Sequence, residues 1–89
     1  MHEHALIADL LREILTTAAR ENARAVVGVS VWLGALSHMT PAHFAEHFAD
    51  AAAGTIAEGA SVAAVVSDDI HDPDAASVRL RGLEVEGPS

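Results

Sequence analysis

The sequence predicts an α/β fold of the two-layer α+β type: a three-stranded mixed sheet with two helices on one of its faces. Apolar residues recur with helical spacing in two segments, and they alternate or run together in three shorter segments. The predicted order is α-β-α-β-β. With 89 residues, the chain is long enough for one small domain over residues 1–89.

The first helix is predicted from His4 to about Asn22. Its apolar positions follow the i, i+3, i+4, i+7 pattern: Leu6, Ile7, Leu10, Leu11, Ile14, Leu15 and Ala18. A second helix is expected to begin within "SHMTPAHF", with Thr40 as its N-cap and Pro41 at its first helical position. It ends before Gly54, and the residues expected to face inward are Phe44, Ala45, Phe48, Ala51 and Ala52.

The first strand is predicted from Ala25 to Leu36. The side chains predicted on one face are Val27, Val29, Val31 and Leu33, and those on the other are Val26, Ser30 and Trp32. A second strand, over 61–66, should run parallel to the first through a right-handed crossover that contains the second helix.

In the third strand, "SVRLRGLEVE", the apolar residues move from even positions to odd positions. This change predicts a β-bulge at Gly82 within one continuous strand. The polar segment 67–77 is interpreted as a hairpin loop between the second and third strands.

Composition excludes several classes of function. A formal net charge of −8 opposes binding to nucleic acid or to an anionic membrane surface. The absence of cysteine excludes disulfides and thiolate ligands, so no structural zinc is expected. There is no apolar run of membrane-spanning length and no signal-peptide pattern, which favours the cytoplasm. Common phosphate-binding, hydrolase and metalloprotease motifs are missing, so we do not expect an enzyme.

The first residues of the chain admit two interpretations. A Ni²⁺ or Cu²⁺ ion can take the amine of Met1, the deprotonated backbone amide of His2 and the His2 imidazole in one plane. Alternatively, His2 is an ordinary terminal residue, Glu3 is a capping carboxylate and His4 is an exposed residue of the first helical turn.

Four further histidines also have two interpretations each. His43 and His47 are four residues apart on the second helix, a spacing that can place two imidazoles on one metal ion or leave both at the edge of the buried face. His38 lies in the connection before Thr40, a place that suits a functional residue but also an ordinary loop histidine. His71 lies in the acidic segment 67–77, which is interpreted as a solvated loop rather than a cation site.

Two long segments resemble the HypA/HybF family of hydrogenase nickel-insertion proteins. They are "MHEHALIADLLREILTTAAR" and "ARAVVGVSVWLGALSHMTPAHFAEHFADAAAGTIAEGASV". The resemblance covers residues 1 to about 66 and resumes at "VRLRGLEVE". The "MHE" start, "GALS" after the first strand and "GTIAEGA" after the second helix carry it.

The resemblance implies a nickel metallochaperone that binds Ni(II) at its N-terminus. It implies that His2 supplies the essential imidazole, that Met1 supplies the amine, and that Glu3 supports the site through its backbone or carboxylate. The implied partners are the large subunit of [NiFe]-hydrogenase and a maturation GTPase, and urease is another recipient that the family serves.

The chain also departs from this family. Members carry a zinc domain with two CxxC pairs between the second and third strands, whereas this chain has only the loop 67–77 there. An alternative function is therefore a protein-docking or scaffold module in hydrogenase maturation that no longer delivers metal. The histidines outside the usual motif are expected only as additional ligands: His4, His38, His43 and His47. A monomer or a weak dimer through an exposed strand edge is expected.

Overall fold

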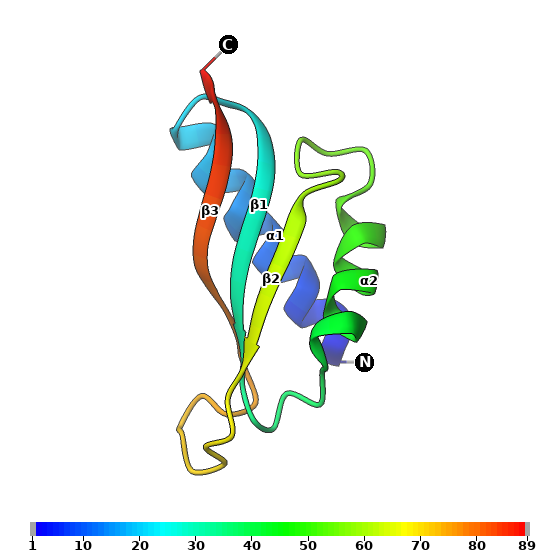
Figure 1. The fold of residues 1–89 in the computed structure, drawn as a ribbon, viewed down its shortest axis with the longest axis vertical. Coiled ribbons are helices and arrows are strands. Elements are labelled where there is room, and N and C mark those ends of the chain that lie inside the picture. Colours follow the sequence, from blue (N-terminus) through cyan, green and yellow to red (C-terminus); the bar gives the residue numbers. More distant parts are fainter. Residues whose placement is uncertain (1, 89) are drawn as a thin grey trace.

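The computed structural model describes the backbone of residues 2–88 and the side chains of residues 4–87. Its elements are α1 (His2–Arg20), β1 (Ala23–Leu33), α2 (Pro41–Ala52), β2 (Ser61–Val66) and β3 (Val78–Pro88). Both helices lie on one side of a three-stranded sheet (Figure 1). The predicted two-layer α+β fold and the order α-β-α-β-β are therefore confirmed.

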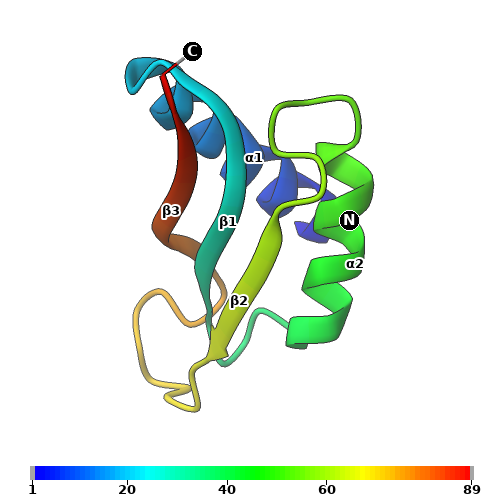
Figure 2. The same ribbon diagram turned by 45° about the horizontal axis from the view of Figure 1, so that its top comes forward.

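The strand order across the sheet is β2-β1-β3. β1 pairs with β2 in parallel, as predicted, and with β3 in antiparallel. The predicted hairpin between the second and third strands is wrong, because β1 lies between them and segment 67–77 passes from one edge of the sheet to the other (Figure 2). β1 takes the central place because it carries five buried residues, whereas β2 carries none.

Two β-bulges adjust the register between β1 and β3. The predicted one is confirmed: Ser30 pairs with Gly82 and Val31 pairs with Leu80, so β3 has one extra residue there. A second bulge lies in β1, at Val27. It places the side chain of Val26 in the core at 2% exposure and leaves Val27 42% exposed, so the predicted orientation of these two valines is wrong.

The boundaries of the first two elements also differ from the prediction. α1 begins and ends two residues earlier than expected, and its buried side chains are Ile7, Leu10, Ile14 and Ala18. β1 begins at Ala23, two residues earlier than expected. It ends at Leu33, three residues earlier than expected, because the chain turns at Gly34.

α2 begins as predicted. The Thr40 hydroxyl oxygen accepts a hydrogen bond from the backbone N–H of His43 at 3.1 Å, and Pro41 follows the cap. Phe44 and Phe48 are buried, and their rings stack with centroids 5.8 Å apart. Ala51 is exposed rather than inward-facing, because it lies about 100° around the helix from the buried Ala52.

Segment 67–77 is fastened to the end of β1. The N–H of Gly34 donates to the carbonyl oxygen of Ser77 at 2.9 Å, and the N–H of Leu36 donates to that of Ala75 at 2.7 Å. The side chain of Ala75 is only 3% exposed. The segment therefore packs against the rest of the domain.

None of the helices in the described part of the chain has the length and apolarity needed to cross a membrane.

Candidate metal centre

The predicted nickel ligands lie where α1 begins. Met1 lies outside the described residues, as do the side chains of His2 and Glu3. His2 is the first residue of α1. The first four N–H groups of a helix have no acceptor within the helix. A metal ion that displaced the amide proton of His2 would therefore break no hydrogen bond of α1.

Three of the additional histidines come together between the two helices. The ring centroids of His43 and His47 are 4.5 Å apart, with the planes tilted by 49°. The ring of His4, on α1, forms a T-shaped pair with that of His47, with a centroid distance of 6.2 Å and an angle of 86° between the planes. His4 and His43 are exposed and His47 is half-buried. The structure therefore brings three imidazoles together beside the start of α1, the helix that begins at His2.

The packing of α1 on α2 accounts for this arrangement. The first turns of α1 lie beside α2 (Figure 1), where Ile7 is buried in the same core as Phe44 and Phe48. Between the helices is an open hollow of about 240 Å³, lined by His4, Ile7, Ala8, His47, Asp50 and Ala51. Imidazole and carboxylate groups line the hollow together with apolar groups.

His38 and His71 are not part of this arrangement. His38 is exposed in the connection before α2, with a left-handed φ of 62°, and makes no ring contact with the other described histidines. The N–H of His71 donates to the Asp69 carboxylate within segment 67–77. Among residues 4–87, no group of three or more histidine, aspartate or glutamate side chains is arranged to hold a metal ion.

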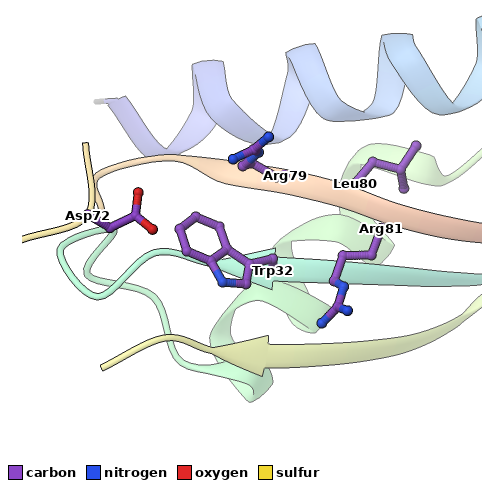
Figure 3. A pocket seen from close by; sticks show the side chains of 5 residues that line it. All are labelled: Trp32, Asp72, Arg79, Leu80 and Arg81. Carbon is purple, nitrogen blue, oxygen red and sulfur yellow. The ribbon is translucent and has the colours of Figure 1, made fainter. Parts of the chain in front are cut away.

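The face of the sheet opposite the helices carries polar residues that the sequence analysis did not single out. Trp32 lies between Asp72 and Arg81 at the edge of an open hollow (Figure 3). The Arg79 guanidinium lies 6.0 Å from the centre of the Trp32 ring and pairs with Asp74 at 3.0 Å. Arg79 and Arg81 alternate along β3 with the half-buried Val78 and Leu80. This alternation in the sequence indicates that the two arginines face outward.

A comparison with protein families finds a match. The model of the HypA family, described as hydrogenase/urease nickel incorporation metallochaperones, matches residues 1–69. The match includes "MHE" at the start and runs from α1 through β2. None of the curated proteins compared with the chain matches it. Metallochaperones carry a metal ion and are not a class of catalysts, so the match indicates a carrier.

Proposed function

Because the chain belongs to the HypA family of hydrogenase/urease nickel-incorporation metallochaperones, we propose that it binds Ni(II) at its N-terminus and delivers the ion during [NiFe]-hydrogenase maturation. The family match that includes residues 1–3 carries this proposal. The start of α1 at His2 supports it, since the helix anchors an otherwise frayed terminus to the core through Ile7 and Leu10.

The ligands follow from the chemistry of the first residues. The amine of Met1, the deprotonated amide of His2 and the His2 imidazole supply three nitrogen donors in one plane, which suits Ni²⁺. Glu3 supports the site through its backbone amide or its carboxylate. The faces above and below the plane stay open, so an incoming thiolate of the acceptor can bind the ion before the nitrogen donors leave. Delivery is then an exchange of ligands, with no change of oxidation state.

The proposed partners are the large subunit of [NiFe]-hydrogenase and a maturation GTPase, met in the cytoplasm. We further propose that segment 67–77 stands where relatives carry a zinc domain, so that this chain works without structural zinc. The hydrogen bonds of Gly34 and Leu36 to this segment support the idea that it closes the fold without a metal ion.

The proposal is tested by calorimetric titration of Ni²⁺ into the tag-free protein. His2→Ala should lose nickel binding at the N-terminus, and so should a form with two residues added before Met1, because both remove a donor. His71→Ala is the matched control, because it removes an exposed imidazole from a distant loop. Binding by His2→Ala with the affinity of the parent protein would overturn the N-terminal site.

A second candidate function is docking without metal delivery. The observation that favours it is the uncovered sheet face with Trp32, Arg79 and Arg81. Among the described side chains Arg81 has no ion-pair partner, whereas Arg79 pairs with Asp74, so Arg81 is the cation that this face can offer to a partner. The occupant that fits this face is an acidic segment of a maturation partner.

Trp32 is the single tryptophan of the chain, so its fluorescence reports on this face alone. Titration with the maturation GTPase should shift the emission, and Arg81→Ala should weaken the complex. Arg12→Ala is the matched control, since Arg12 is exposed on α1. A complex that forms normally with Arg81→Ala and leaves the Trp32 emission unchanged would rule out docking here.

A further inference from the structure

The two histidines of α2 are held at a spacing suited to one metal ion. His43 and His47 lie one helical turn apart, and their ring centroids are 4.5 Å apart. Their backbone positions are fixed because the next residues, Phe44 and Phe48, are buried at 0% and 1% exposure. His43 is exposed and His47 is half-buried, so the pair lies at the surface of α2.

The ring separation agrees with joint coordination. Nitrogen ligands bind transition metals at roughly 2.0–2.1 Å. The centre of an imidazole then lies roughly 3 Å from the ion, so two rings at neighbouring positions of one ion have centres roughly 4–5 Å apart. The observed 4.5 Å falls in this range before any metal is bound.

The surroundings favour a cation. Asp50 lines the same hollow as His47, and the chain as a whole has a formal net charge of −8. The His4 ring of α1 lies 6.2 Å from the His47 ring, centre to centre. No arginine lines this hollow.

We propose that His43 and His47 form a second transition-metal site, separate from the N-terminal chelate, which we call the α2 histidine pair. It binds one divalent ion such as Ni²⁺ through two imidazoles and completes the coordination with water. Because the described residues provide no third ligand in place, the site is open and exchanges its ion readily. This inference goes beyond the proposed N-terminal chelate and does not depend on it.

The test uses the full chain with the N-terminal chelate blocked by His2→Ala and two residues added before Met1. Titration with Ni²⁺ alone should still detect one site in this background. Adding His43→Ala should weaken that site at least about tenfold, since even groups outside the ligand shell contribute roughly 10- to 100-fold. His43 is exposed, so this variant keeps the core intact, which circular dichroism verifies.

The matched control is His71→Ala in the same background, which should bind Ni²⁺ unchanged. Six-coordinate Ni²⁺ is paramagnetic, so the ring proton signals of His43 and His47 should broaden before those of His38 and His71. Equal affinity with and without His43, or broadening centred on other histidines, would overturn the proposal. The N-terminal chelate fails if His2→Ala keeps the full nickel binding of the parent protein, whereas the α2 histidine pair fails if the blocked background binds no nickel, so the two failures are distinguishable.

Discussion

Gly34 leaves no room for a side chain beneath the main chain of Ala75. A Cβ atom at position 34 would collide with the carbonyl oxygen of Ala75, while the N–H of Gly34 donates to the carbonyl oxygen of Ser77 at 2.9 Å. The end of β1 and segment 67–77 are therefore interlocked through backbone atoms, which cannot move aside as a flexible side chain can.

Gly34→Ala should consequently destabilise the domain by about 1–3 kcal/mol or more, because the collision involves backbone. Urea unfolding monitored by circular dichroism measures this loss. Gly82→Ala is the matched control: no atom lies within 4 Å of a Cβ there, so its free energy of unfolding should change far less. Similar losses in the two variants would show that segment 67–77 does not press on β1.

The two bulges show what a hydrophobic pattern can and cannot predict. At Gly82 the apolar positions change parity, so the extra residue is visible in the sequence. Val27 is preceded by a second valine, Val26. The pattern of apolar and polar residues is therefore the same whichever of the two valines faces the core. Only pairing with Glu84 and Val85 decides which one is buried. The order of the strands in the sheet could not be predicted either, because the sequence pattern does not show which edge of β1 pairs with the third strand.

The candidate metal centre was predicted in part. The spacing of His43 and His47 was visible, because four residues make about one helical turn. The approach of His4 to His47 was not visible, since it depends on how α1 packs across α2 and no local pattern encodes that angle. The roles of Met1, His2 and Glu3 remain predictions that rest on resemblance.

Thr40→Ala should cost about 1 kcal/mol of stability. The Thr40 hydroxyl oxygen accepts the N–H of His43, which has no acceptor within the helix. The midpoint of urea unfolding measures the effect. Thr16→Ala is the control, because Thr16 is exposed within α1 and alanine favours the helix there. A smaller loss for Thr40→Ala than for Thr16→Ala would contradict the role of the cap.

Ile14→Ala should destabilise the domain by about 2–5 kcal/mol, because it leaves a cavity between α1 and the sheet. The Ile14 side chain is 0% exposed, whereas that of Ile70 in segment 67–77 is 57% exposed. The same substitution at Ile70 should therefore change the free energy of unfolding by less than about 0.5 kcal/mol. Equal effects at the two isoleucines would mean that α1 is not part of the core.

Nickel binding at the N-terminus should release more protons than binding at the α2 histidine pair. The chelate displaces the amide proton of His2 and any proton on the amine of Met1, whereas binding through the imidazoles of His43 and His47 deprotonates no amide. Acidification should therefore weaken the chelate more steeply. Calorimetry in buffers with different ionisation enthalpies counts the protons released per nickel ion, with and without two residues added before Met1. An equal count in the two forms would mean that the His2 amide is not a ligand.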